Sequence, residues 1–216
     1  LGFKNETIAN LGAYARVFGT VTPTYLFGPC ATGVYEIPAA YTNVKAVYTN
    51  TAPVDAYRGA GRPEATYTIE RLVEKASMEL GIDKTELRIK NFPTAFPFKQ
   101  TLVHTVDSGD YVAGMEKAKQ MADYKGFEAR RKESEAKGKL RGIGVTSYFE
   151  ACGIAPSAAV MSLGCGVGLW ESAEVRFNPT GQVTVYTGSH SHGQSHQTTF
   201  AQIAADELGV PIENID

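Results

Sequence analysis

A run of apolar residues at steps of three and four after Pro63 limits most strongly how this chain can fold. The run comprises Ile69, Leu72, Val73, Ala76 and Leu80. This spacing places apolar side chains on one face of an α-helix. Pro63 and Glu64 suit a first helical turn, and Gly81 suits a helix stop. The sequence therefore predicts a helix from Pro63 to Leu80 that buries one face.

Shorter elements are expected on both sides of this helix. The first sixty residues are rich in Gly, Pro, Thr and Tyr, and their β-forming residues occur in short runs such as 33–37 and 44–49. Both runs are expected to be strands. After the helix, Asp83 is the expected cap of a second helix over Lys84–Lys90.

The stretch between Asn91 and Gln100 contains Pro93 and Pro97 and suits neither a helix nor a central strand. We expect a domain boundary there, which gives a first domain over residues 1–95 and a second over 96–216. Residues 111–137 are expected to be helical. Their charged run at 128–135 has mixed signs and is typical of a solvated helix face.

The remaining residues predict strands followed by a helix. Residues 142–149 are apolar and β-branched, and 173–177 and 182–187 alternate around the turn signal Asn-Pro-Thr-Gly, so the last two runs predict a hairpin. A helix over 198–208 is expected to stop at Gly209. Together these patterns predict an α+β fold with mixed sheets and packed helices.

Composition excludes several classes of protein. The chain has 216 residues, of which 43% are hydrophobic and 20% charged, so it can bury a core and is not a disordered or fibrous chain. Its net charge of −2 gives no basic excess that would attract nucleic acid. Cys30, Cys152 and Cys165 form no CxxC pair, which argues against a zinc site and favours a reducing compartment. No apolar run is long enough to span a membrane.

The glycine-containing loop Ala56–Glu64 lies just before the predicted helix at Pro63. A helix start with nearby glycines can bind an anion through backbone N–H groups, and Arg58 and Arg62 could add bidentate contacts. A simple strand-to-helix turn explains the same residues. The loop matches neither GxxxxGK[ST] nor GxGxxG, so it does not support nucleotide binding.

A second candidate site is the stretch from Gly188 to His196. It contains His190, His192 and His196, a spacing that resembles a metal site. The amides and side chain of Gly193, Gln194 and Ser195 could instead cradle an anion at the following helix. A polar loop with local hydrogen bonds is the third interpretation, and the residues alone leave all three open.

Nucleophilic chemistry has less support. Cys152 lies in Tyr-Phe-Glu-Ala-Cys-Gly, where a small buried hydrophobic residue is the more common role. Glu150 could act as an acid or base, although no partner for it is evident from the sequence.

Taken together, four segments resemble the large subunit of the molybdenum hydroxylases, the family of xanthine dehydrogenase, aldehyde oxidase and aerobic carbon monoxide dehydrogenase. The segments are Tyr48–Thr51, Ala56–Ala65, Glu86–Asn91 and Gly188–Gln194. They lie in the family's order across nearly the whole chain. The resemblance is greatest to the form II carbon monoxide dehydrogenase large chain, whose active-site loop reads AYRGAGR.

The resemblance implies parts of two cofactor-binding domains and a molybdopterin cytosine dinucleotide cofactor. Tyr57, Arg58 and Gly59 would lie in the active-site loop beside the molybdenum, with Arg58 as the catalytic residue, while Gly193 and Gln194 would bind the pterin. The metal would be held by the cofactor's sulfurs. An iron–sulfur small subunit and an FAD-binding medium subunit would take the electrons, and the expected location is the cytoplasm, including the inner face of the membrane.

Two positions depart from the family pattern. Form I enzymes carry AYRCSFR with a copper-ligating cysteine where this chain has Gly59, which excludes copper chemistry through that position. Ser195 replaces a usual glycine, so ordinary backbone angles are expected there. The family's catalytic glutamate would lie beyond residue 216, so an isolated fragment should be inactive. The hypotheses from other classes are a histidine-metal protein using Zn or Fe and a scaffold that only docks partners.

Overall fold

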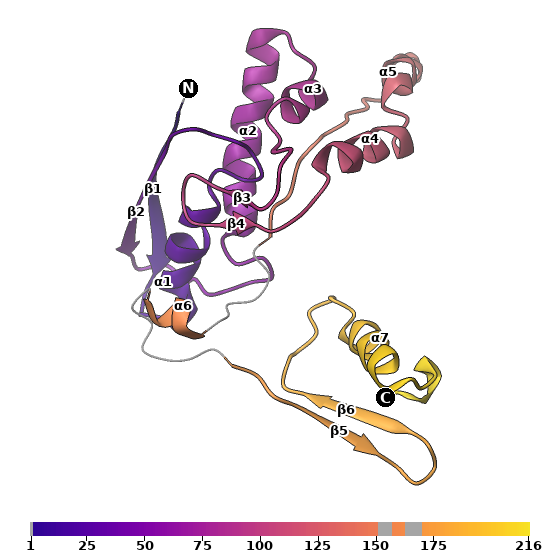
Figure 1. Cartoon of the computed structure of the whole chain (residues 1–216). Helices are drawn as coiled ribbons and strands as arrows, with labels where there is room; N and C mark the ends of the chain where they lie inside the picture. The colour runs from indigo at the N-terminus through magenta and orange to yellow at the C-terminus, as the bar shows by residue number, and fades with distance from the viewer. Residues whose placement is uncertain (1, 151–156, 163–169) are drawn as a thin grey trace. The chain divides into compact units, whose positions relative to one another are not determined.

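A computed structural model describes residues 2–150, 157–162 and 170–216. The chain forms two compact units, residues 1–151 and 152–216, each described separately below. Figure 1 shows the order of the elements along the chain. The helices and strands of the first unit are β1 (Phe3–Gly12), α1 (Val17–Val21), η1 (Thr22–Leu26), η2 (Gly28–Cys30), β2 (Ala40–Tyr48), α2 (Arg62–Leu80), α3 (Lys84–Ile89), β3 (Phe98–Lys99), β4 (Thr105–Val106), α4 (Tyr111–Met121), η3 (Tyr124–Gly126) and α5 (Phe127–Ala136).

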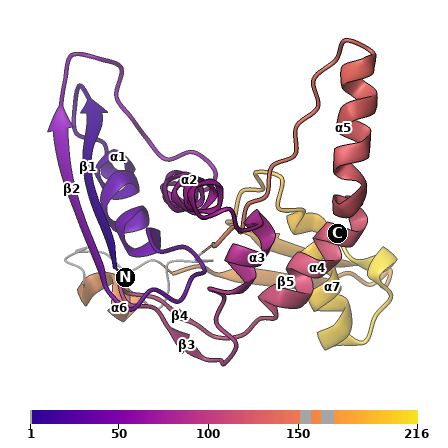
Figure 2. The same cartoon turned by 90° about the horizontal axis from the view of Figure 1, so that it is seen from above.

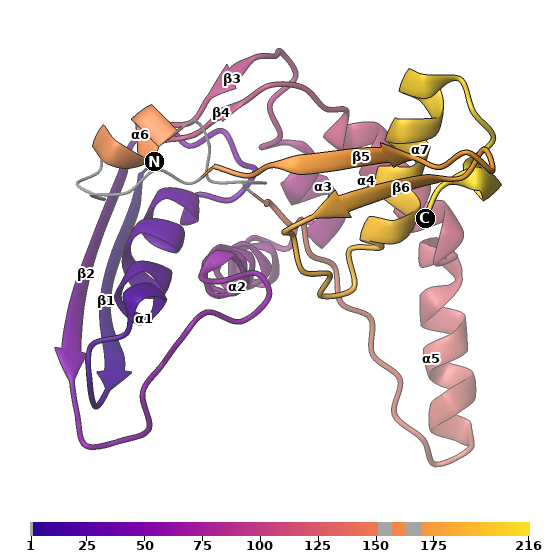
Figure 3. The ribbon, with the colours of Figure 1, turned by 90° about the horizontal axis from the view of Figure 1, so that it is seen from below.

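Strands β1 and β2 pair in parallel, from Phe3 opposite Ala40 to Gly12 opposite Tyr48. The α1 and α2 helices lie on the same side of this pair (Figures 2 and 3). A short antiparallel pair joins β3 to β4. The predicted strand at 44–49 is thus confirmed, and so is the α+β class.

The α2 helix confirms the helix expected from the apolar spacing. It begins at Arg62, carries Pro63 in its first turn and ends at Gly81, which has the left-handed φ of 64°. Its neighbour α3 is capped as expected, because the Asp83 carboxylate accepts hydrogen bonds from the amides of Thr85 and Glu86.

Three predicted elements differ in the structure. Residues 33–37 form no strand and begin with turns and a bend. Val34 and Tyr35 are neighbours in the sequence and are both buried, whereas neighbours in a strand point to opposite faces. Residues 142–149 run without regular secondary structure; exposure still alternates there, but no strand within the described residues pairs with them. The helix expected over 111–137 is interrupted at Asp123, whose left-handed φ of 44° ends one helix and starts a new turn.

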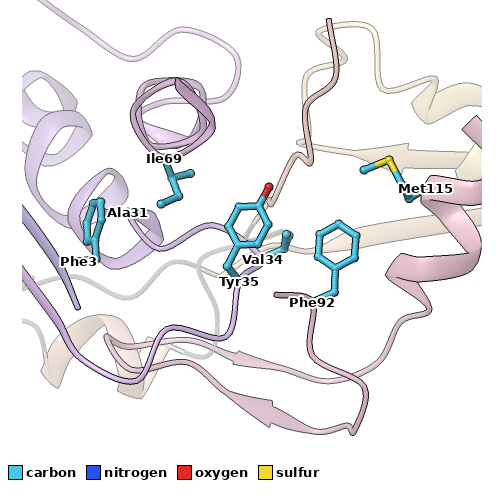
Figure 4. Packing of buried hydrophobic residues seen from close by; sticks show 7 residues of the cluster. All are labelled: Phe3, Ala31, Val34, Tyr35, Ile69, Phe92 and Met115. Atoms are coloured by element: carbon cyan, nitrogen blue, oxygen red, sulfur yellow. The ribbon is translucent and has the colours of Figure 1, made fainter. Parts of the chain in front are cut away.

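The core of the first unit joins segments that are far apart in the sequence (Figure 4). Tyr35 stacks on Phe92 with ring centroids 5.7 Å apart, and Phe92 meets Tyr111 edge to face. The buried cluster comprises Phe3, Ala31, Val34, Tyr35, Ile69, Phe92 and Met115. Its members come from β1, α2, α4 and the loops between them, so burial of this cluster ties α2 to the rest of the unit.

The second unit contains α6 (Ser157–Ser162), β5 (Ala173–Phe177), β6 (Val183–Thr187), α7 (His196–Leu208) and η4 (Ile212–Asn214). Strands β5 and β6 form the expected antiparallel hairpin (Figure 1). The α7 helix ends at Gly209 as predicted and begins two residues earlier than residue 198. Among the described residues, no helix is both long and apolar enough to cross a membrane.

Candidate functional site

The Arg58 loop, residues 56–61, is a tight turn that leads directly into α2. The Ala60 amide donates to the Tyr57 carbonyl at 2.8 Å, and the Arg62 amide donates to the Gly59 carbonyl at 3.1 Å. Gly59, Ala60 and Gly61 all have positive φ, at 100°, 38° and 89°. The loop therefore turns its backbone sharply at the helix start, a geometry that favours glycine.

Close packing fixes the base of this loop. A Cβ at Gly61 would lie 2.4 Å from the Thr22 carbonyl oxygen and 2.8 Å from the Phe27 amide nitrogen. No side chain fits there without moving the backbone. Because Gly61 has no side chain, the start of α2 can pack directly against η1.

The two arginines of the loop region take different positions. Arg58 is exposed, and the neighbouring Tyr57 ring is 87% exposed. Arg62 is buried, and its Nε lies 3.3 Å from Glu150 Oε1. Of the two arginines considered for contacts to an anion, Arg62 is thus held inside the unit by its pairing with Glu150, while Arg58 lies on the exposed side of the loop.

A polar cluster lies beneath the Arg58 loop. Cys30 Sγ lies 3.4 Å from His104 Nε2. The positive charge of Arg62 acts on the pKa of both residues. Burial raises the pKa of the Cys30 thiol to about 11, with Arg62 opposing and Glu150 reinforcing the shift. Burial and the Arg62 charge both lower the pKa of His104. At neutral pH this is a neutral thiol–imidazole pair, which is unsuited to nucleophilic attack.

Sequence reasoning missed His104 and Tyr148 as neighbours of the loop. The Tyr148 hydroxyl donates to Glu150 Oε2 at 2.5 Å, and Glu150 in turn pairs with Arg62. Burial, together with this hydrogen bond, raises the pKa of Tyr148 to about 12. No short-range pattern in the sequence could have signalled these contacts, because the residues lie far from Gly59 along the chain. Cys152 and Cys165 lie outside the described residues.

In the second unit, the Gln194 loop, residues 188–196, leads into α7. Gly193 has a φ of 96°. The Gln194 side-chain oxygen accepts a hydrogen bond from the His192 amide and so turns back onto its own loop. A cavity of about 470 Å³ adjoins the loop and includes Ser189, His190 and His196 in its lining.

The three histidines of this loop do not converge on one point. His190 and His192 pack edge to face at 4.7 Å, and His192 Nδ1 lies 3.1 Å from the His190 carbonyl oxygen. The start of α7 directs His196 against Phe200, with ring centroids 4.7 Å apart. Within the described part of the chain, no three His, Cys, Asp or Glu side chains are placed to hold a metal ion. The histidine-metal hypothesis is therefore not supported.

Ser195 differs from expectation. Its φ of 61° and ψ of 44° are left-handed, so the ordinary backbone angles expected for a serine there are wrong. The conformation arises where the chain turns sharply from the loop into α7. It is a conformation that glycine adopts without a steric cost.

The helices that follow the two loops share one property. Both α2 and α7 begin without a side-chain hydrogen bond at the cap. The α1 and α5 helices also begin without such a bond, whereas α3 and α4 are each capped by an aspartate, Asp83 and Asp110. The uncapped starts leave positive helix ends next to the two candidate loops, which suits an anionic ligand.

Two family models match most of the chain. Both describe a molybdopterin cofactor-binding domain; one matches residues 1–92 and the other residues 117–216. The matches include both loops.

Known proteins agree with these matches. The chain is 40% identical to the carbon monoxide dehydrogenase large chain of Hydrogenophaga pseudoflava and 42% identical to that of Afipia carboxidovorans, with 100% of this chain aligned in each. It spans 27% and 28% of those relatives. The crystal structure of quinoline 2-oxidoreductase from Pseudomonas putida 86 superposes with a TM-score of 0.83 and 36% identity over 96% of this chain and 27% of that one. The chain therefore belongs to the molybdopterin cofactor-binding large subunits of the molybdenum hydroxylase family.

Proposed function

We propose that this chain is part of the catalytic large subunit of a molybdenum-dependent hydroxylase that binds molybdopterin cytosine dinucleotide. Tyr57, Arg58 and Gly59 bind on the molybdenum side, and Gly193 and Gln194 bind the pterin. The observation that carries the proposal is the match of both loops and their helices to molybdopterin cofactor-binding domains. The cytosine form follows from the resemblance to the family.

The residues of the chain fit such a cofactor. The starts of α2 and α7 lack a side-chain cap, and each follows a glycine with positive φ, Gly61 or Gly193. Backbone N–H groups at uncapped helix starts bind phosphate and other oxyanions. An exposed guanidinium at Arg58 adds a positive charge on the side of the first loop.

The proposed reaction takes its oxygen from water. Carbon monoxide and water give carbon dioxide, two protons and two electrons; a C–H substrate and water give the hydroxylated product, two protons and two electrons. The bound cofactor supplies the two-electron redox chemistry. In this reaction Arg58 orients the substrate and stabilises negative charge that develops beside the loop.

The substrate is a small carbon compound, in keeping with the resemblance of the active-site loop to that of the form II carbon monoxide dehydrogenase large chain. Gly59 supplies no thiolate, so copper chemistry through this position is excluded. One relative of known structure acts on quinoline by name, which makes an organic ring a second substrate class to assay. Assays of carbon monoxide and quinoline oxidation distinguish the two substrate classes.

The electrons pass to an iron–sulfur small subunit and an FAD-binding medium subunit. Cys30, the cysteine within the described residues, is buried beside His104 and does not belong to a set that could hold an iron–sulfur cluster. We place the complex in the cytoplasm, including the inner face of the membrane. We also place the boundary of the two cofactor-binding domains between residues 95 and 96, within the segment 93–116 that lies between the two family matches.

The test is metal and pterin analysis of the full-length large chain purified with its partner subunits, together with assays of carbon monoxide and quinoline oxidation. We expect stoichiometric molybdenum and pterin. Arg58→Ala should keep the cofactor and lose turnover, while Gln194→Ala should lower the pterin content. Arg71→Ala and Gln202→Ala, which change exposed residues on α2 and α7, serve as matched controls. A wild-type complex that contains no molybdenum would contradict the proposal.

A further inference from the structure

The direction in which Gly59 would carry a side chain identifies a residue that the loop motif does not contain. A Cβ built on Gly59 would lie 2.6 Å from Pro63 Cγ and 2.8 Å from Pro63 Cδ. The third-nearest atom to that Cβ is the Tyr148 hydroxyl oxygen, at 3.6 Å. Because the proline ring cannot move aside and φ is 100°, position 59 is restricted to glycine.

Tyr148 is held in this place by a chain of polar contacts. Its hydroxyl donates to Glu150 at 2.5 Å, and Glu150 pairs with the buried Arg62 in the first turn of α2. The raised pKa keeps the phenol protonated at neutral pH, so the donation to Glu150 persists. The loop and the hydroxyl are therefore tied to the same helix start.

The Tyr148 residue is nevertheless half exposed, at 50%. With its proton engaged by Glu150, the hydroxyl oxygen keeps lone pairs that can accept a hydrogen bond. Tyr148 thus presents an apolar ring and a fixed acceptor next to the Gly59 backbone of the loop.

We propose that Tyr148, fixed by Glu150 and Arg62 beside the backbone of Gly59, is a positioning and specificity-determining residue of the Arg58 loop. The inference rests on the proposed function, because that function places the substrate beside this loop. A substrate that carries an N–H or O–H donor, or a ring that packs on the phenol, would contact Tyr148. The Pro63 ring packs against position 59, so no side chain from the loop comes between the Gly59 backbone and Tyr148.

The test compares Tyr148→Phe with Tyr124→Phe in the full-length complex with its partner subunits. Tyr124 is a matched control, because its hydroxyl also donates to a carboxylate, that of Asp83 at 2.9 Å, and its pKa is also raised to about 12. Each variant loses one hydroxyl and keeps its ring. The readouts are molybdenum and pterin content, KM and kcat with carbon monoxide and quinoline, and the Mo(V) paramagnetic resonance spectrum after partial reduction with dithionite in the presence of quinoline.

We expect Tyr148→Phe to retain molybdenum and pterin, to change the resonance spectrum, and to raise KM about tenfold for the compound that is turned over, a loss of about 1.4 kcal/mol in binding. Tyr124→Phe should match the wild type in all three. Glu150→Ala should also raise KM. Glu150→Gln, which keeps an acceptor for Tyr148, should raise KM much less.

Spectra and KM values that are the same for Tyr148→Phe and Tyr124→Phe would overturn the inference while leaving the proposed function intact. Loss of molybdenum in proportion to activity would also overturn it, because Tyr148 would then be structural only. A wild-type complex without molybdenum overturns the proposed function and this inference with it.

Discussion

Arg88 Nε donates to Glu70 Oε2 at 2.8 Å, and this contact joins α3 to α2 in the interior of the first unit. The Arg88 side chain is 0% exposed, and a second carboxylate, Glu74, lies 3.4 Å from Nη1. Glu70 also accepts a hydrogen bond from the Tyr35 hydroxyl. Burial, followed by this contact with Glu70, raises the pKa of Tyr35, so the phenol stays neutral.

Replacing Arg88 by methionine should destabilise the full-length large chain by about 3–5 kcal/mol, because Glu70 would remain buried without its partner. Lys75→Ala, which removes an exposed ion pair with Glu79 at 3.7 Å, should cost only about 0–1 kcal/mol. Urea unfolding measures both. Equal losses for the two variants would contradict the buried role of Arg88.

Ser195→Gly should stabilise the chain by about 1 kcal/mol, because glycine adopts the left-handed conformation without the cost that serine carries. The reverse change nearby, Gly193→Ala, should destabilise it, since the φ of Gly193 is 96°. Thermal unfolding of the full-length complex measures whether each substitution raises or lowers the melting temperature. A lower melting temperature for Ser195→Gly would show that the serine side chain contributes more than its backbone costs.

Gly61→Ala should destabilise the start of α2 by about 2–4 kcal/mol, because positive φ and overpacking act together. The added methyl group would collide with the Thr22 carbonyl. Gly114 within α4 is the control: nothing lies within 4 Å of a Cβ there. Gly114→Ala should stabilise by about 0.4–1 kcal/mol. Denaturation midpoints of the two variants should therefore move in opposite directions.

Asp83 gives a prediction for the pH dependence of stability. Burial acts to raise its pKa, but hydrogen bonds from Thr85, Tyr124 and the Glu86 amide outweigh burial and hold the pKa below the ordinary value of 3.8. A lowered pKa in the folded state means that the stabilisation is complete above about pH 4 and is lost as the pH falls through the folded-state value.

Asp83→Asn should therefore be less stable than the wild type at pH 7, and the difference should shrink below pH 4. Urea unfolding at pH 7, 5 and 3 measures it. A difference that stays constant over this range would mean that the charge of Asp83 does not contribute.

The sequence patterns correctly predicted those helices and strands that are determined by residues close to them in the chain. The apolar spacing after Pro63 gave α2, Asp83 gave the start of α3, and the Asn-Pro-Thr-Gly turn gave the β5–β6 hairpin. In each case the residues that decide the element lie within a few positions of it. Both candidate loops were also found locally, as glycine-containing segments before helices.

Contacts between distant segments were not predictable in this way. Residues 33–37 have β-forming side chains, yet the packing of Tyr35 on Phe92 and its contact with Glu70 turn them inward. The break at Asp123 depends on a left-handed residue inside a pattern that otherwise favours a helix. The pairing of Arg62 with Glu150 likewise brings together residues that the linear order keeps apart.

The parallel pairing of β1 with β2 also dictates an order of events during folding. Two adjacent strands in parallel cannot close through a short hairpin, so residues 13–39 must cross from the end of one strand to the start of the other. During synthesis, β1 is made before β2, so the full register of this pair is reached only after residue 48 has left the ribosome. The β1–β2 pair therefore forms only after the whole crossover has been made, so its completion depends on a segment that lies between the two strands.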